Sequence, residues 1–451
     1  MESATETGLR REMGLRDVSL LAIACMTASR WIPAAAHAGP GSVTLWVLGA
    51  VFFVIPMARV LGALVVKNPC AGGFYQWTRQ DFGAWHGFLC FWVYWMGLAL
   101  WFPTASMFYM RMGLYALGPA FARLGENRAA LIAVALAAIW IALFSNMIGV
   151  RIGKWTENIG GGANWVLVGL LAVVAVLVWR ARGAATGMDV FPKWNWATVS
   201  LWAAVAYGLS GLEMASLMGA EIRDPKRTLP RAGWIASSFI CVFYVTGTIS
   251  MLIILQPDKI SEMTGVAEVG ESAGGLLHLG WMGPVLALLV MASGVGQIGG
   301  IGTTISRLPF AAGMDQLLPN AFARVHPRWG TPHLSILALG IVATFLLLVF
   351  QIGDSMRAAY DSLVSLMVIT GFLPYIYIFG SGWKVGQRIS ALSGWGITLV
   401  AIVCSVVPTE AVSHIWVFEG KLAAGTVAVI GTAWLVYRRT ANAVSSPTNF
   451  S

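Results

Sequence analysis

The sequence predicts an all-α integral membrane protein with about twelve transmembrane helices. Of its 451 residues, 57% are hydrophobic and only 11% are charged, whereas soluble domains carry roughly 25% charged residues. The apolar residues gather into runs that can cross a hydrocarbon core of about 30 Å, which takes about 20 helical residues. Because backbone groups must be paired inside lipid, and because these runs are too long and too uniformly apolar for barrel strands, we expect helices.

The predicted helices follow one another with short polar connections. The first run begins only after a polar arm and shows no small-residue cleavage pattern, so we expect a spanning helix rather than a cleaved signal peptide. The predicted spans are 17–37, 42–66, 84–117, 129–148, 156–180, 196–219, 232–255, 280–306, 334–352, 358–381, 391–409 and 415–437.

The charge pattern predicts orientation rather than a nucleic-acid partner. The net charge is +9, and most Lys and Arg residues fall in the loops on the amino-terminal side of the predicted membrane. Since such residues concentrate in cytoplasmic loops, we expect a multi-pass protein of the cell membrane with both termini in the cytoplasm. The bilayer is the expected partner, and no nucleic acid is expected.

Enzyme, cofactor and metal-cluster signatures are absent from the sequence. There is no HExxH, GxSxG or Walker motif, which argues against a metalloprotease, a hydrolase and an ATP-driven pump. The five cysteines are scattered and form no CxxC pair, so the sequence predicts neither a zinc site nor a disulfide framework. We therefore expect a protein that is not an enzyme and binds no cofactor.

Two predicted spans contain residues that break a helix. The first span carries Pro33, which removes a backbone donor. The sixth carries Gly208, Ser210 and Gly211 within four residues, where continuous helix is locally poor. Breaks five helices apart, at corresponding places in two halves, are typical of inverted-repeat transporters with a binding site at the membrane midplane. Ordinary kinks are the alternative, since Gly and Pro are common in membrane helices.

Each break also contains a charged residue. A charge inside a membrane costs roughly 3 kcal/mol on insertion scales, so it needs a partner or a function. Arg30 lies in the first break and Glu213 in the second. Three roles are open to Arg30: it pairs with Glu213, it faces a substrate carboxylate, or it extends to the outer surface from near the helix end.

The breaks predict a site for a zwitterion. Exposed amides near Ser29 to Trp31 would bind a carboxylate, because a half-helix N-terminus carries partial positive charge. Exposed carbonyls near Tyr207 to Ser210 would bind an ammonium group, with the Tyr207 ring covering it. The third helix adds aromatic candidates. The predicted substrate-binding residues are Thr27, Ala28, Ser29, Arg30, Trp31, Trp101, Phe102, Tyr207, Gly208, Ser210 and Gly211.

The eighth predicted helix is rich in glycine between Gly294 and Gly302. Small residues at this spacing permit close helix contact. Ser293, Thr303 and Thr304 could ligate sodium through oxygen, but such hydroxyls more often bond to their own backbone. They are weak sodium candidates, and no other metal site is predicted.

Three loop segments resemble motifs of the amino acid–polyamine–organocation (APC) superfamily. Residues 69–75 read PCAGGFY, which resembles the family's P-x-x-G-G-x-Y segment. Residues 221–232 read EIRDPKRTLPRA, which resembles E-x-x-N-P-x-x-x-x-P-x-A. Ser306-Arg307, Asp315, Pro319 and the GTP at 330–332 are similar to the family's S-R, D-x-x-x-P and G-T-P sequence. The three segments lie in the family's order, from about the first helix to the ninth.

The resemblance implies a leucine-transporter-like fold with alternating access and an amino-acid-like substrate. It implies a five-plus-five inverted repeat plus two C-terminal helices, and Glu213 matches a sixth-helix glutamate linked in some members to proton coupling. An apolar setting would favour its neutral form. The expected parts are a cytoplasmic arm (1–16), a first repeat (17–180), a second repeat (196–381), helices eleven and twelve (391–437) and a cytoplasmic tail (438–451).

The sequence also departs from the family pattern. Ser29-Arg30-Trp31-Ile32 stands where the family's first break usually reads G-x-G-I-F. Asn164 takes the place of a fifth-helix lysine that stands in for sodium in many members, so a lysine-based coupling does not carry over. Ala63 replaces the common glutamate of the second helix. The coupling candidates are Glu213, Asn164 and Ser293.

The leading hypothesis is a secondary active transporter of amino acids or related small amines, as a proton-linked symporter or as an antiporter that exchanges substrates. One alternative is a sodium-coupled amine transporter. Another is a membrane sensor that keeps the fold without transporting, because Arg30 occupies the usual glycine site.

Overall fold

The computed structural model describes residues 11, 13–70, 72–148, 150–192, 202–203, 205–350, 356–407 and 415–445. In this part of the chain, the regular structure is helical apart from one β-bridge, between Met13 and Ile222. The expectation of an all-α protein is confirmed.

The first predicted span is two helices, as its break requires. Helix α1 (Leu15–Met26) and helix α2 (Trp31–His37) differ in direction by 43°. Pro33 lies in the first turn of α2, where a missing N–H leaves no helical hydrogen bond unmade. The sequence therefore starts a second helix here instead of continuing the first.

The remaining helices of the first half follow the predicted spans. The second span is α3 (Gly41–Gly49), the π-helical η1 (Ala50–Val54) and α4 (Ile55–Lys67). Helix α6 (Ala84–Ala116), helix α8 (Arg128–Ile148) and helix α9 (Val150–Arg182) follow. Two short helices that were not predicted, α5 (Phe74–Phe82) and α7 (Pro119–Glu126), flank α6.

The second half begins with a predicted span, 196–219, that lies partly outside the described residues. Its described end holds helix α11 (Met214–Leu217) and the 3-10 turn η2 (Gly219–Glu221). Helix α12 starts at Pro225, and the Asp224 side chain caps it by accepting from the Arg227 amide at 3.4 Å. The other elements are α12 (Pro225–Ile254), η3 (Pro257–Lys259), α13 (Gly265–Leu277), α14 (Met282–Ile305), α15 (Arg307–Met314), η4 (Asn320–Ala323), α16 (His333–Phe350), α17 (Met356–Lys384), α18 (Arg388–Val406) and α19 (Ile415–Ser445).

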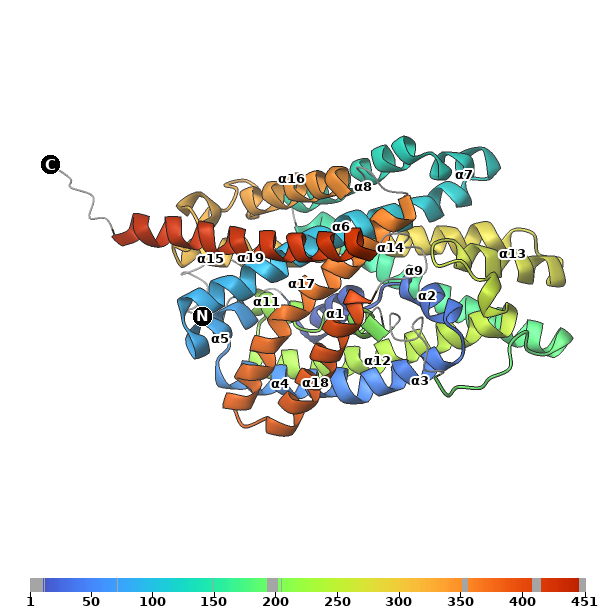
Figure 1. The fold of residues 1–451 in the computed structure, drawn as a ribbon, viewed down its shortest axis with the longest axis horizontal. Helices are drawn as coiled ribbons and strands as arrows, with labels where there is room; N and C mark the ends of the chain where they lie inside the picture. The colour runs from blue at the N-terminus through green and yellow to red at the C-terminus, as the bar shows by residue number, and fades with distance from the viewer. Residues whose placement is uncertain are drawn as a thin grey trace.

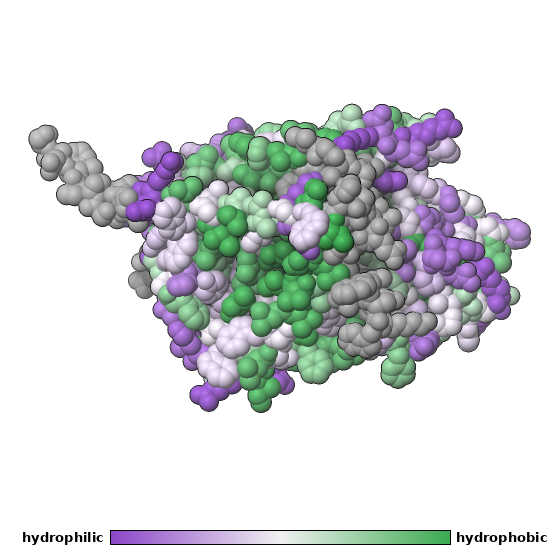
Figure 2. Space-filling view, in the orientation of Figure 1, coloured by the Kyte–Doolittle hydropathy of each residue, from purple (hydrophilic) through white to green (hydrophobic). Residues whose placement is uncertain are grey.

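Within the described ranges, nine helices are long and apolar enough to cross a membrane, or ten if α1 and α2 form one broken span. Helix α16 is apolar but shorter over its described length. On the face drawn in Figure 2, hydrophobic side chains gather across the middle and hydrophilic side chains gather at the two ends. This band is the pattern that a bilayer imposes on a spanning protein.

The broken segments lie in the centre of the bundle. Helix α1 contacts α9, α11, α12 and α14, and α6 packs against both α14 and α17 (Figure 1). Helix α18 packs on α4 and α17, and α19 lies along α6 and α17. The arrangement therefore encloses the two breaks between long helices and leaves α18 and α19 on the outside.

Candidate functional site

The break between α1 and α2 exposes backbone groups, and Tyr244 of α12 bonds to them. Its hydroxyl accepts from the Ala28 amide at 3.0 Å and donates to the Met26 carbonyl at 3.1 Å. The Tyr244 ring stacks on Trp46 with ring centroids 4.1 Å apart. An unpaired backbone group in a dry interior is costly, so Tyr244 stabilises the gap between the two helices.

The Thr27 carbonyl, at the same break, accepts from two side-chain amides. Gln297 of α14 donates at 3.0 Å and Asn164 of α9 donates at 3.3 Å. Asn164 also donates to the Thr27 hydroxyl at 3.2 Å. The break is therefore tied to two helices of the surrounding bundle through neutral donors.

The second break depends on glycine. Gly211 has φ +112°, a conformation that L side chains rarely adopt, and an added Cβ would lie 3.1 Å from the Cys25 carbonyl oxygen. Gly208 lies against the rings of Trp31 and Trp46, where an added Cβ would approach both to 3.1 Å. These two glycines let the second break lie directly against the first.

A small cavity lies between the two breaks. Its volume is about 20 Å³, which is room for about one water and far too little for an amino acid, so the site is closed in this structure. The lining combines aromatic rings, small apolar groups and the polar side chains of Gln297 and Ser210. The lining residues are Cys25, Met26, Ala28, Trp31, Leu98, Trp101, Tyr207, Gly208, Ser210, Met214, Gln297 and Ile301.

Arg30 lies behind the aromatic wall of this cavity and is 2% exposed. Its guanidinium is 4.4 Å from the Trp31 ring centroid and 5.6 Å from that of Trp101. Nη1 donates to the Thr104 hydroxyl at 2.9 Å, and Nη2 lies 3.6 Å from the sulfur of Met367. Nε has no hydrogen-bond partner. Arg30 is thus a buried cation held by neutral groups.

Two of the roles considered for Arg30 do not fit this geometry. Burial keeps the guanidinium inside the protein, so Arg30 does not extend to the outer surface. Among the described residues, the ion pairs with nitrogen and oxygen within 4.0 Å do not include Arg30 with Glu213. The role that the geometry leaves open is recognition of an anion that enters the site.

Glu213 is 1% exposed and lies among hydrogen-bond donors. The Tyr94 hydroxyl of α6 donates to one carboxylate oxygen, and the Gly211 amide donates to the other at 3.1 Å. The Tyr375 hydroxyl of α17 accepts from the same Gly211 amide at 3.3 Å. Glu213 is therefore a buried carboxylate held by a tyrosine hydroxyl of α6 and by the amide of the second break.

The other predicted site residues lie either at the two breaks or inside helices. The Ser29 hydroxyl lies 3.1 Å from that of Ser293, which also donates to the Val290 carbonyl at 2.8 Å. Thr304 donates to its own helix at the Gly300 carbonyl. The buried side chains of Phe102 and Thr303 do not line the cavity. The hydroxyl bonds of Ser293 and Thr304 are the ordinary helix bonds that weaken a sodium role.

Several site residues have only a weak signal in the sequence. Tyr94, Tyr244, Gln297 and Tyr375 lie in long apolar spans, and their roles appear only when the helices are packed. A polar side chain in the middle of a membrane span was the available sign, since such groups usually face the bundle interior. That sign identifies candidates but not partners.

The loop motifs converge at the membrane side that holds Met13. Asp315 accepts from the Tyr75 hydroxyl at 2.6 Å and from the Gln76 amide at 2.5 Å, and it pairs with Arg79 at 2.8 Å. Burial, followed by the hydrogen bond to Asp315, raises the pKa of Tyr75 above its ordinary value. These contacts join α5 to the end of α15.

A second contact on this side joins η2 to α15. Arg307 and Glu221 form a buried ion pair at 3.1 Å, and Arg307 also donates to the Thr303 carbonyl at 2.6 Å. The Met13 amide donates to the Glu221 carbonyl at 3.0 Å. Segments from all three predicted motifs therefore close this end of the bundle together.

Comparison with known proteins agrees with this architecture. A family model described as amino acid permease matches residues 13–420. An uncharacterized transporter of Legionella pneumophila is 26% identical over 95% of this chain and 97% of its own length. The glutamate/serine transporter AimA of Bacillus subtilis is 24% identical over 80% of this chain and 70% of its own. The mouse Asc-type amino acid transporter 1 is 25% identical over 71% of this chain and 60% of its own.

Proposed function

The chain belongs to the amino acid permease family of the APC superfamily, and we propose that it is a secondary active transporter that moves amino acids by alternating access, linked to protons or by exchange. The family and the relatives named above are transporters, not enzymes, and the chain is a multi-pass membrane protein. The single observation that carries the proposal is the closed cavity between the broken pair α1 and α2 and the second break at Gly208 to Gly211. Such breaks offer backbone amides and carbonyls to a zwitterion at one place.

The closed state of the site supports alternating access. An amino acid does not fit a cavity of about 20 Å³, so transport requires the surrounding helices to separate. On the side of Met13, separation would break the contacts of Asp315 and the ion pair of Arg307 with Glu221. We assign this side to the cytoplasm, and we assign residues 17–180 and 196–381 to two inverted repeats.

Arg30 supports an anionic substrate group. A buried guanidinium with an unpaired Nε is expensive to maintain without an anion. It lies behind Trp31 and Trp101, which line the cavity. The relative AimA is named for glutamate and serine transport. We propose that Arg30 attracts a substrate carboxylate and favours acidic over neutral amino acids.

Glu213 is the proposed proton-coupling group. It lies between α6 and α11, beside the Gly211 amide of the second break. Movement of that break would remove or restore a donor to the carboxylate, which changes the relative stability of its charged and neutral forms. A substrate that alters the break would therefore also alter proton binding.

Counterflow into proteoliposomes tests the proposal. Vesicles are loaded with an unlabelled mixture, and labelled acidic, neutral and basic amino acids are offered one at a time. We expect acidic amino acids to accumulate, and we expect Arg30→Gln to raise their KM by about 30-fold, the effect of losing one buried charged partner. Arg111→Gln, which removes a cation near the outer end of α6 that does not line the cavity, is the matched control.

The outcomes separate the parts of the proposal. Accumulation of neutral amino acids by both Arg30→Gln and the unchanged protein would contradict the role of Arg30 while leaving transport intact. Specific ligand binding without accumulation would replace transport by the sensor function. Accumulation of an amine only when sodium is present would favour the sodium-coupled alternative.

A further inference from the structure

Arg59 is a second arginine within an apolar span, and the transport site does not use it. It belongs to α4, in the span Gly41–Lys67, and precedes Lys67 by eight residues, or about 12 Å along the helix axis. Its side chain is exposed, while its neighbours Ala58 and Val60 are buried. A cation at this depth costs roughly 3 kcal/mol on insertion scales unless an anion or water reaches it.

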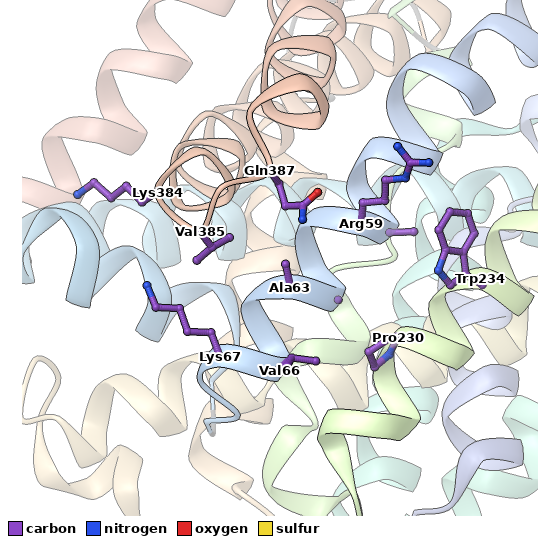
Figure 3. A pocket seen from close by; sticks show the side chains of 11 residues that line it. Arg59, Ala63, Val66, Lys67, Pro230, Trp234, Lys384, Val385 and Gln387 are labelled. Carbon is purple, nitrogen blue, oxygen red and sulfur yellow. The ribbon is translucent and has the colours of Figure 1, made fainter.

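A crevice of about 850 Å³ opens beside Arg59. It lies between α4, α12 and the turn that joins α17 to α18 (Figure 3). Gly62 has no side chain and Ala63 has only a methyl group, so the α4 side of the crevice leaves space for a group the size of a lipid head. The lining residues are Ala58, Arg59, Gly62, Ala63, Val66, Lys67, Pro230, Trp234, Lys384, Val385 and Gln387.

The charged side chains that line this crevice are all positive. Three of the lining residues are cations, and none is an acid. Figure 3 shows Lys67 and Lys384 on one side of Ala63 and Arg59 on the other, with Gln387 between them. The Lys384 ammonium donates to the Asp81 carbonyl and lies 4.2 Å from the Phe82 ring centroid, so it is held at the rim. The ion pairs of the described residues involve neither Arg59 nor Lys67.

The apolar walls of the crevice continue onto the outer face of the bundle. Val66 is 52% exposed and Trp234 is 43% exposed, although both belong to candidate spans. Ile235, next to Trp234, is 47% exposed. Apolar side chains left open in spanning helices face lipid tails. Arg59 is therefore a cation beside an apolar surface that faces lipid, and Lys67 lies at the end of the same helix.

We propose that this crevice binds the phosphate head of an anionic phospholipid, with its acyl chains along Trp234. The planar guanidinium of Arg59 suits a phosphate oxygen pair, and the Lys67 ammonium adds a point charge nearer the surface. A lipid fits better than a soluble anion, because Arg59 lies about 12 Å inside an apolar span. Basic pockets between membrane helices are suited to such heads. The lipid would brace α4 against α12 and the α17–α18 turn.

Thermal unfolding of the purified full-length protein in detergent tests this site. Phosphatidylglycerol is titrated, with phosphatidylcholine of the same chains as the neutral lipid. We expect phosphatidylglycerol to stabilise the protein at lower concentration, and Arg59→Gln with Lys67→Gln to weaken its apparent affinity by about 30-fold, from two removed charges. Arg438→Gln with Arg439→Gln removes the same charge at the end of α19 and should leave the affinity unchanged.

Two further measurements distinguish loss of this site from an unstable variant, and a lipid from a soluble anion. Ala63→Phe fills the crevice without changing charge, so it should also lose the response even if the double variant is unstable. Glycerol 1-phosphate carries the head chemistry without tails and should have no effect. Equal loss in the Arg438 and Arg439 variant, an equal response to phosphatidylcholine, or stabilisation by glycerol 1-phosphate alone would overturn the proposal.

Discussion

The Asn164 side-chain amide of α9 donates to the Thr27 backbone carbonyl at 3.3 Å and to the Thr27 hydroxyl at 3.2 Å. The same carbonyl accepts from Gln297 at 3.0 Å. An exposed carbonyl at a helix break is a good cation ligand, but here two neutral amides occupy its acceptor positions. The first break is thus stabilised without a bound ion.

Uptake is therefore expected to be independent of sodium. Replacing sodium by choline on both sides of a proteoliposome should change the initial rate by less than about twofold, since no cation has to complete the site. The measurement is labelled amino acid uptake at fixed pH and fixed membrane potential. A tenfold loss of rate in choline would contradict this prediction and would point to a sodium site at the weak candidates Ser293, Thr303 and Thr304.

Glu213→Gln is expected to remove the pH dependence of net uptake. Glutamine keeps the size of the side chain but cannot release a proton, so a proton gradient should no longer drive accumulation. Exchange at fixed pH should persist, because it needs no net proton movement. Glu126→Gln, at an exposed position of α7, is the control. Unchanged pH dependence in Glu213→Gln would show that another group carries the proton.

Gly211→Ala is expected to destabilise the protein. A residue held at φ +112° costs about 1–3 kcal/mol when it carries a Cβ, and that Cβ would also press on the Cys25 carbonyl. Thermal unfolding in detergent should show a lower Tm and counterflow should be lost. Gly169→Ala in α9 meets nothing within 4 Å and should be neutral or slightly stabilising. An equal Tm for the two variants would mean that the second break does not need glycine.

Cys70, in the loop between α4 and α5, is expected to react slowly with alkylating reagents. Burial raises the pKa of this thiol to about 12, and only the thiolate reacts. At pH 8 the rate should be roughly 2,000-fold below that of an ordinary thiol with a pKa near 8.5. Because the pKa is raised, the rate should rise about tenfold per pH unit from pH 7 to pH 10.

The Cys70 measurement uses a variant in which the other four cysteines are replaced. The control places a cysteine at exposed Lys226 in a background without any native cysteine. Its rate should level off above about pH 9, because its thiol is then ionised. Matching profiles for the two thiols would show that Cys70 is open to water, and therefore that the loop contacts around Asp315 are released in solution.

The two helix breaks show which features of the fold can be predicted from local sequence. Pro33 and Gly211 act on their own backbone, so both breaks can be read from the residues that make them. The loop motifs are also local, and they indicate the superfamily without any knowledge of helix packing. Arg59 is the counterexample, because its residue type is evident but its exposure beside a crevice is not.

The partners of the site residues depend on packing. Tyr244 bonds to Ala28 across 216 positions of sequence, and Gln297 bonds to Thr27 across 270. The sequence suggested Glu213 as a partner for Arg30, whereas the structure gives it Thr104, Met367 and two rings. Such contacts arise where helix faces meet, and many faces of a uniformly apolar span look alike in sequence.

The sequence by itself determined the all-helical membrane class, the positions of the two breaks and the transporter superfamily. Each of these depends on residues that act locally: apolar length, backbone-breaking residues and short loop motifs. Only the tertiary structure decided that the site is closed, that Arg30 is buried with no ion pair to a carboxylate among the described residues, and that Glu213 accepts a hydrogen bond from Tyr94. The physical reason is that burial and hydrogen bonding depend on several helices at once. A bilayer requires that polar groups be paired inside the protein, but it does not determine which helix faces pair them.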